Sequence, residues 1–358
     1  MSTGTGRAIV LANGLYDTCF AKTAHGLVRG PSRYELLGVV DPAQAGRDAG
    51  EALDGNARGI PVRAALAEFL DAGVRATHCV VGVATEGGAL PAALRADLLV
   101  AARAGLTLVN GLHQLLADDA ELASLAAGAG GAILDLRRPR PVSALRFWTG
   151  EILELDVPRV ALLGTDCAVG KRTTGQILLA ALRAAGLRAE MVYTGQTGWL
   201  QGLEHGFLFD ATPNDFVAGE LERALLSCAR ATAPDVILIE GQSSLRNPSG
   251  PAGAELVLSG GARGVVLQHA PAREHHQGFE RRGCRIAPIG EEIELLRLYG
   301  AQVWAVALHE GELDEQAAEA SRTGLERELG LPVVRPLRGG AEALARVVAA
   351  RVSAPERR

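Results

Sequence analysis

The sequence predicts an α/β protein built from two parallel-sheet domains. Short apolar runs alternate with amphipathic helical patterns along almost the whole chain, which is typical of repeated β-α-β units. The chain has 358 residues, which exceeds one ordinary core, because a domain has about 150 residues. A segment rich in proline and charge, residues 137–158, separates two alternating sets. We therefore expect one domain over residues 1–150, linker included, and a second over residues 151–358.

The first domain is expected to be a doubly wound parallel sheet. Its clearest helical patterns are closed by Gly73 and Gly105, a common way for a helix to end. The expected strands lie at residues 8–12, 34–40, 77–84, 106–110 and 132–136, and the expected helices at residues 61–72, 91–104 and 113–127.

Only one feature of this domain suggests that it binds a dinucleotide. Asp41 ends the second strand, about where an acid would bind a ribose hydroxyl. The first turn, residues 13–17, lacks the G-x-G-x-x-G pattern that cradles a pyrophosphate. The sequence therefore argues against nicotinamide binding.

The second domain repeats the alternation. The expected strands lie at residues 160–163, 188–193, 235–240, 264–268, 303–308 and 332–335. The expected helices lie at residues 174–185, 216–230, 252–259, 290–299, 312–329 and 341–352. Phe147 and Trp148 are expected to dock the linker on a domain face.

Composition excludes several classes of protein. Hydrophobic residues make up 48% and charged residues 22%, as in a folded protein. The net charge of -5, with no concentrated run of Lys or Arg, argues against nucleic-acid binding. No secretory signal is recognisable, and no apolar run approaches the roughly 20 residues of a membrane span. Five scattered cysteines without CxxC spacing indicate reduced thiols. We expect a cytoplasmic protein with neither membrane nor nucleic-acid partners.

Residues 164–174 form a phosphate loop between an apolar strand and a helix. Two glycines let the backbone N–H groups converge, the helix N-terminus adds partial positive charge, and a lysine adds a formal one. We expect an anion there, a phosphate or a pyrophosphate. The expected binding residues are Gly164, Thr165, Asp166, Ala168, Val169, Gly170, Lys171, Arg172, Thr173 and Thr174. Cys167, within the loop, is expected to be a packing residue.

The loop departs from the usual nucleotide-binding pattern. Five residues, not four, separate its glycines, and Arg172 occupies the position where Ser or Thr usually binds Mg²⁺. Thr173 or Thr174 can substitute for that hydroxyl. Lys and Arg total 36, yet only Lys22 and Lys171 are lysine. A chain that otherwise uses arginine keeps lysine where a compact ammonium is needed, which makes Lys22 a second candidate.

Further candidates follow predicted strands, where an α/β sheet gathers its ligand groups. Gln196 lies in a glycine-rich turn, and His269 ends a strand as a candidate base. Glu240 ends an apolar strand, where a carboxylate is costly to bury unless it meets a metal, a lysine or a substrate amine. Asp215 or Asn214 either caps the helix that follows or, in the case of Asp215, faces the loop's ligand. The adjacent His275 and His276 cannot share a helix face, so no metal site is expected.

Several of these segments together resemble one known family. The loop with Glu240-Gly241 is similar to the phosphate loop and acidic strand of dethiobiotin synthetases. Over nearly the whole chain the sequence resembles the DUF1611 family, in the segments 21–26, 194–198, 215–220, 239–242 and 267–271. The resemblance implies a Rossmann-like N-terminal domain, a P-loop NTPase-like C-terminal domain and a homo-oligomer. It also implies an N-acetyltransferase that moves acetyl from acetyl-CoA to a D-amino acid such as D-glutamate.

That resemblance implies roles for the candidate residues. Coenzyme A carries a pyrophosphate and a 3′-phosphate, so the loop can hold it without hydrolysis and without metal. Acetyl transfer needs a proton acceptor and donors to an oxyanion. The implied acceptors are Glu240, Asp215 or His269, and the implied donors are Gln196, Gln242 or loop N–H groups. Substrate binding falls to Lys22, His25, Gln196, Gln242, Arg246 and Arg273, in a site expected between the domains.

Two alternatives remain open at this stage. One is an ATP- and Mg²⁺-dependent enzyme of the dethiobiotin-synthetase type, with Lys171 on the phosphates and Thr173 or Thr174 on the metal together with Asp215 or Glu240. The other is a non-enzymatic nucleotide sensor. The sequence leaves the identity of the amino acid undetermined.

Overall fold

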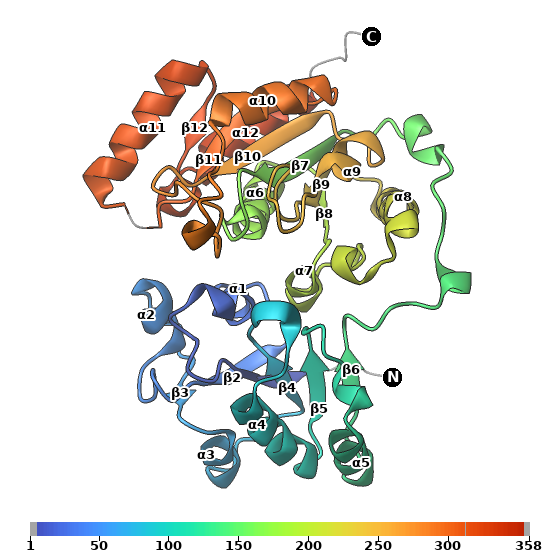
Figure 1. Ribbon diagram of the computed structural model, residues 1–358, viewed down its shortest axis with the longest axis vertical. Helices are drawn as coiled ribbons and strands as arrows, with labels where there is room; N and C mark the ends of the chain where they lie inside the picture. The colour runs from blue at the N-terminus through green and yellow to red at the C-terminus, as the bar shows by residue number, and fades with distance from the viewer. Residues whose placement is uncertain (1–5, 312, 354–358) are drawn as a thin grey trace. The chain divides into compact units, whose positions relative to one another are not determined.

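The computed structural model describes residues 6–311 and 313–353 (Figure 1). Contacts divide the chain into two units, which we call the first unit (Met1–Arg140 and Gln196–Gly202) and the second unit (Pro141–Gly195 and Leu203–Arg358). Residues 141–150, which the sequence analysis assigned to the first domain with its linker, thus lie in the second unit. A seven-residue segment of the second half packs in the first unit.

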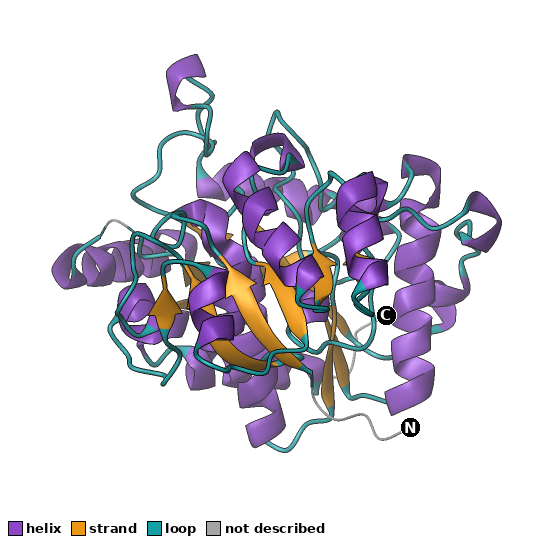
Figure 2. Cartoon of the chain, turned by 90° about the horizontal axis from the view of Figure 1, so that it is seen from below, coloured by secondary structure: helices purple, strands orange, loops and turns teal. Residues whose placement is uncertain are grey.

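The first unit is a parallel sheet in the order β3-β2-β1-β4-β5-β6. Its strands are β1 Arg7–Leu11, β2 Glu35–Val40, β3 Val62–Arg63, β4 His78–Val81, β5 Thr107–Asn110 and β6 Ile133–Asp135. Its helices are α1 Lys22–Arg29, α2 Ala49–Asp54, α3 Leu66–Asp71, α4 Ala92–Arg103, α5 Ala120–Gly128 and α7 Gln196–Leu200. Figure 2 shows helices on both sides of the strands. This strand order confirms the doubly wound prediction.

The second unit is a parallel sheet in the order β12-β11-β10-β7-β9-β8. Its strands are β7 Arg159–Gly164, β8 Ala189–Val192, β9 Val236–Glu240, β10 Gly264–His269, β11 Gln302–Leu308 and β12 Val333–Val334. Its helices are α6 Lys171–Ala184, α8 Asn214–Thr232, α9 Ala254–Leu258, α10 Ile289–Leu298, α11 Glu315–Leu329 and α12 Ala341–Val352. No helix in the described part of the chain is both long and apolar enough to cross a membrane.

Alternation along each strand builds a core on both faces of the second sheet. In β9, Ile237 and Ile239 face one apolar cluster, whereas Val236 and Leu238 face another. Successive side chains of a strand point to opposite faces, so a strand with helices on both sides must be apolar throughout. Glu240 is the exception at the end of this apolar run, and it is only 4% exposed.

Some sequence-based boundaries were wrong. The helix expected at residues 61–72 is the short strand β3 followed by α3, because Pro61 opens extended chain there. The helix expected at residues 113–127 is a 3-10 turn followed by α5. The helix α7 was taken for a glycine-rich turn. The start expected for the helix at residues 312–329 falls on residue 312, which lies outside the described residues.

Candidate active site

The strand order places the candidate site at the junction of β7 and β10. The chain leaves β7 toward β8 at one edge of the sheet and leaves β10 in the opposite direction, toward β11. Ligands of open α/β sheets bind at the carboxyl ends of strands where the chain turns in opposite directions. Gly164 ends β7 and His269 ends β10, so the phosphate loop opens at this point.

The backbone of the phosphate loop makes a tight turn. Ala168 and Gly170 have positive φ angles of 49° and 93°, and a Cβ atom at Gly164 would lie 2.8 Å from Val169 Cγ2. Lys171 begins α6, and its Nζ donates to the carbonyl oxygens of Asp166 at 2.7 Å and Ser243 at 2.6 Å. The ammonium is thereby held against the loop and the chain that follows β9. An anion bound to the converging N–H groups would meet this charge.

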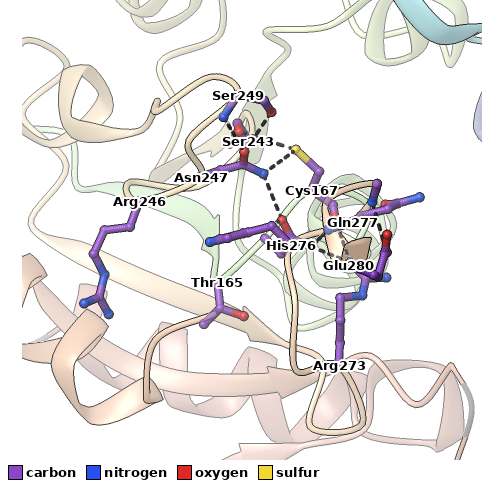
Figure 3. A network of polar contacts seen from close by, with 12 residues as sticks. Thr165, Cys167, Ser243, Arg246, Asn247, Ser249, Arg273, His276, Gln277 and Glu280 are labelled. Atoms are coloured by element: carbon purple, nitrogen blue, oxygen red, sulfur yellow. Dashed lines mark hydrogen bonds and ion pairs between the residues drawn. The ribbon is translucent and has the colours of Figure 1, made fainter. Parts of the chain in front are cut away.

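The buried carboxylate of Asp166 is the centre of a cage of donors, and Figure 3 shows the donor residues Asn247, Arg273, His276 and Gln277 beside the phosphate loop. Four groups contact its two oxygens at 2.9 Å each. These are Asn247 Nδ2, Arg273 Nη1, His276 Nδ1 and the main-chain N–H of Gln277. Two segments that follow β9 and β10 are thus tied to the phosphate loop. The side chain of Asp166 shapes the loop, and direct ligand binding by Asp166 stays a prediction.

The cage also determines the charge of Asp166. Burial by itself raises the pKa of this carboxyl, but hydrogen bonds from His276, the Gln277 and Cys167 N–H groups and Arg273 bring the pKa below its usual value. The group is therefore ionised at neutral pH. Since an ionised carboxylate only accepts hydrogen bonds, His276 Nδ1 donates to it.

Glu240 has a different environment at the end of β9. Its Oε2 accepts the main-chain N–H groups of Thr194 at 3.0 Å and Gly195 at 3.3 Å. Burial raises the pKa of Glu240, while the charge of Arg172, these two N–H groups and the charge of Lys171 oppose that rise. A Cβ atom at Gly241 would lie 2.0 Å from the Leu162 carbonyl oxygen and 3.1 Å from Lys171 Cδ. Only glycine therefore lets the lysine stem pass beside Glu240.

Two polar side chains of β10 contact the loop from the other side. His269 Nδ1 lies 3.1 Å from Thr165 Oγ1, and burial lowers the pKa of His269 to about 4. Its imidazole is thus neutral at physiological pH. The Gln268 amide is hydrogen-bonded to Thr174 Oγ1. This hydroxyl is one of the two that were expected to bind Mg²⁺ in place of the Ser or Thr that Arg172 replaces.

The arginines expected to bind substrate are both held by acids. Arg273 Nη1 bonds to Asp166 and, at 2.8 Å, to the carbonyl oxygen of Cys167. Arg246 pairs with Glu292 at 2.7 Å through Nε and with Glu291 at 2.8 Å through Nη1. Among the described residues, Arg246 Nη2 is buried without a hydrogen-bond partner. Gln242, a proposed donor, bonds through Nε2 to Thr194 Oγ1 at 3.0 Å.

Comparison with known proteins decides the family. A model of the "Domain of unknown function (DUF1611_C) P-loop domain" matches residues 146–345, and one of the "Domain of unknown function (DUF1611_N) Rossmann-like domain" matches residues 42–139. The chain belongs to the DUF1611 family. The predicted Rossmann-like and P-loop domains are thereby confirmed.

Two relatives and a solved structure extend the match over most of the chain. A D-glutamate N-acetyltransferase of Tritonibacter scottomollicae is 31% identical over 76% of this chain and 80% of its own length. A D-glutamate N-acetyltransferase of a Pseudoalteromonas species is 30% identical over 74% and 79%. The crystal structure of a DUF1611 family protein from Anabaena variabilis has a TM-score of 0.87 and 30% identity, and the match covers 96% of this chain and 99% of that one.

One segment that suggested DUF1611 membership, residues 215–220, has a structural role in this protein. Gly219 allows α8 to approach the linker, since a Cβ atom there would lie 2.0 Å from the Arg146 carbonyl oxygen. Glu220 and Glu222 are buried and accept main-chain N–H groups of the linker, from Arg146 at 3.1 Å and Thr149 at 2.7 Å. These carboxylates clamp the linker on α8.

Asp215 itself is exposed in the first turn of α8. The expectation that Asn214 or Asp215 caps this helix was wrong, because the N-cap is Pro213 and no side chain caps it. A catalytic role for Asp215 stays a prediction. The expected docking of the linker is confirmed: the Phe147 and Phe216 rings lie 4.7 Å apart, and Trp148 Nε1 donates to Ser259 O at 3.0 Å.

In the Rossmann-like domain of this DUF1611 chain, the candidate ribose-binding acid is fully engaged. Asp41 is buried, and its two oxygens accept four main-chain N–H groups, two from the turn after β1 and two from its own turn. The donors are Gly14, Tyr16, Ala43 and Gln44. Asp41 therefore braces two turns of the backbone, which agrees with the missing glycine pattern.

The remaining predicted residues lie in the first unit. Lys22 is the exposed first residue of α1, and His25, one turn later, contacts the Tyr16 carbonyl oxygen through Nε2. Gln196 is buried at the start of α7, and its Cγ would lie 2.7 Å from a Cβ atom at Gly111. The neighbouring Thr197 contacts Thr23 of α1 through its hydroxyl at 2.8 Å. Substrate binding by Lys22, His25 and Gln196 stays a prediction.

The cage around Asp166 was not predicted from the sequence. Asn247 and His276 lie 81 and 110 residues from Asp166 in sequence, and both are buried. The available signal was the polar run after β10, Arg273 to Gln277, in which we had assigned Arg273 to substrate binding and had considered the histidines only for a metal site that we did not expect. Among the described residues, no group of three His, Cys, Asp or Glu side chains is placed to hold a metal ion.

Proposed function

We propose that this protein is an N-acetyltransferase that moves the acetyl group of acetyl-CoA to the amino group of an acidic D-amino acid, such as D-glutamate. The observation that carries the proposal is the match to two D-glutamate N-acetyltransferases at 31% and 30% identity. Each match covers about three quarters of the chain, 76% and 74%, which is more than either structural unit alone.

The phosphate loop supports binding of coenzyme A. Its backbone N–H groups and Lys171 suit a pyrophosphate, and the ammonium is already positioned by two carbonyl oxygens. Acetyl-CoA offers a pyrophosphate whose bonds need not break in the reaction. The loop then acts as an anchor for the carrier, and the chemistry occurs at the thioester.

Acetyl transfer requires the substrate ammonium to lose a proton. The free amine then attacks the thioester carbonyl carbon and a C–N bond forms. The C–S bond breaks, and the second proton that the nitrogen loses passes to the sulfur, which leaves as the thiol of coenzyme A. The products are the N-acetyl amino acid and coenzyme A, with one proton released to solvent through the base.

Glu240 is the best candidate for that base. Its carboxyl is buried beside Lys171, and burial raises its pKa, which suits proton acceptance closer to neutral pH. His269, with a pKa of about 4, binds a proton far less readily. Asp215 is exposed to solvent in the first turn of α8 and does not end a strand of the sheet. We assign proton transfer to Glu240 on these grounds.

Arg246 is the favoured partner for a substrate carboxylate. Leaving a buried guanidinium N–H without an acceptor costs about 1–3 kcal/mol, and Arg246 Nη2 is such a group. A carboxylate of an acidic amino acid would satisfy it. Because Arg246 is already oriented by Glu291 and Glu292, binding would require little reordering of its side chain.

The test is a thiol-release assay with acetyl-CoA and a panel of D- and L-amino acids. We expect release that depends on D-glutamate or D-aspartate and exceeds that with the L-enantiomers. Arg297→Ala removes an exposed cation of α10 that pairs with Glu294, and serves as the control for loss of a positive charge. Absence of release across the panel would remove the proposal. Mg²⁺-dependent ATP binding without acetyl-CoA binding would favour an ATP-dependent enzyme, and nucleotide binding without any turnover would favour a sensor.

A further inference from the structure

The position that normally brings Mg²⁺ to a phosphate loop is altered in this chain. In nucleotide-hydrolysing loops a Ser or Thr directly after the lysine binds the metal, together with an acid at the end of a neighbouring strand. Here the residue after Lys171 is Arg172, half-buried at the start of α6. A guanidinium carries a permanent positive charge and offers donors only, so it cannot act as a metal ligand.

Three side chains that could offer an oxygen to a metal have partners within the protein. Both oxygens of Asp166 lie in the donor cage, and Oε2 of Glu240 accepts two main-chain N–H groups. The hydroxyl of Thr174 is bonded to Gln268. Binding a metal to any of these would first break contacts that the buried site depends on.

Thr173 does not restore the missing ligand. It follows Arg172 on α6, and successive residues of an α-helix project about 100° apart around the axis. Its hydroxyl therefore does not project where that of a Thr at position 172 would. The loop lacks the usual hydroxyl at the place where Mg²⁺ would bridge two phosphates.

Two cations instead stand beside the acid of β9. The stem of Lys171 passes over Gly241, the residue after Glu240, as the 3.1 Å approach of Lys171 Cδ to a Cβ atom there shows. The charge of Arg172 also acts on Glu240: burial raises the pKa of the carboxyl, and Arg172 is the strongest influence against that rise, ahead of Lys171. A dication in this place would be repelled by both side chains.

We propose that Arg172 takes the place of the divalent cation, so that the loop binds a pyrophosphate ester through Lys171 and Arg172 without metal and discriminates against Mg²⁺-nucleotides. This inference rests on the proposed function, in which the pyrophosphate is that of coenzyme A. It makes Arg172 the residue that selects an acyl carrier over a nucleoside triphosphate. Two fixed cations neutralise the diphosphate and leave its bonds intact, because no metal polarises a bridging oxygen.

The test is calorimetric titration of the full chain with acetyl-CoA, and separately with inorganic pyrophosphate, in Mg²⁺ or in EDTA. We expect affinities that change less than about two-fold on chelation. Arg172→Thr should lower the affinities for acetyl-CoA and for pyrophosphate about ten-fold or more, which is the range for loss of a charged hydrogen bond. Arg172→Lys, which keeps the charge, should recover part of the loss. Arg297→Thr, which removes an exposed cation on α10, should bind like the wild type.

The outcomes separate this inference from the proposed function. Acetyl-CoA binding that disappears in EDTA, or an unchanged affinity of Arg172→Thr, overturns the role of Arg172 and leaves acetyl transfer intact. Failure of acetyl-CoA to bind under either condition overturns both. Thermal melting of each variant separates loss of binding from loss of folding, and Arg172→Lys keeps the test decisive if Arg172→Thr does not fold.

Discussion

Replacing Asp166 by alanine should destabilise the second unit strongly, although Asp166 lies in a loop. The substitution removes the acceptor for three side chains and one main-chain N–H, all at 2.9 Å. Two of the donors, Asn247 and His276, are 1% and 3% exposed, so water cannot replace the carboxylate. Arg273 would be left as a partly buried cation without its acid.

The expected magnitude follows from this geometry. Removing one partner of a buried ion pair costs about 3–5 kcal/mol, and the partial exposure of Arg273 argues for the lower end. In a domain of this size 1 kcal/mol corresponds to a shift in Tm of roughly 2–4 °C. We therefore expect Asp166→Ala to lower the Tm of the second unit by about 6–12 °C.

Scanning calorimetry measures the effect, because a chain of two units can melt in two transitions and only one should move. Asp235→Ala is the matched control, since Asp235 is a partly exposed carboxylate of the same unit that pairs with Arg188. Its Tm should stay near that of the wild type, because a surface ion pair contributes only about 0–1 kcal/mol. Equal melting of Asp166→Ala and the wild type would refute a structural role for the cage.

The pH dependence supplies a second check. Burial raises the pKa of Asp166, but hydrogen bonds from His276, Gln277 and their neighbours outweigh burial, so the pKa is lowered in the folded protein. A carboxyl with a lowered folded pKa stabilises the fold above its unfolded pKa of about 4, and this stability is lost as the pH falls through the folded value. The gap between wild type and Asp166→Ala should therefore be largest near neutral pH and shrink in acid. A gap that widens in acid contradicts this account.

Three further outcomes are expected. Glu240→Gln should lower kcat about 100-fold or more because the base is lost, and an unchanged kcat would exclude that role. The pKa of Glu240 is raised in the folded protein, so ionisation of this carboxyl opposes folding as the pH rises through the folded pKa. The Tm of the variant should therefore be no lower than that of the wild type at pH 8. Lys171→Ala should raise the KM for acetyl-CoA about ten-fold with less effect on the KM for the amino acid, as initial rates will show. Asp41→Ala should lower the Tm of the first unit alone. The protein that remains folded should release thiol at the wild-type rate. A lower kcat with an unchanged Tm would instead place Asp41 in the active site.

Local patterns of the sequence were sufficient for the fold and the phosphate loop. A strand, a glycine-bounded turn with Lys171 and a helix are contiguous in sequence, so their spacing alone indicates an anion site. Glu240 stands out for a similar reason, as an acid at the end of an apolar run. In both cases the chemistry is set by residues adjacent in the chain.

Contacts distant in sequence were not predictable. The pairing of Asp166 with His276 spans 110 residues, and each residue alone has several ordinary explanations. Asp41 looked like a ribose ligand because its position in the chain is typical of one, yet the four N–H groups that it accepts depend on how two turns approach one another. A carboxylate's role depends on which donors surround it, and donors are brought together only by folding.

The sequence by itself determined that this protein has two α/β domains, a phosphate loop and a lysine at its centre, because periodicity and loop spacing are properties of neighbouring residues. Only the tertiary structure decided which acids remain for chemistry. Asp41, Asp166, Glu220 and Glu222 are occupied in holding backbone and loops, whereas Glu240 is buried beside Lys171 with a raised pKa. The physical reason is that burial and hydrogen bonding, which set the ionisation of a carboxyl, arise from contacts between distant parts of the chain.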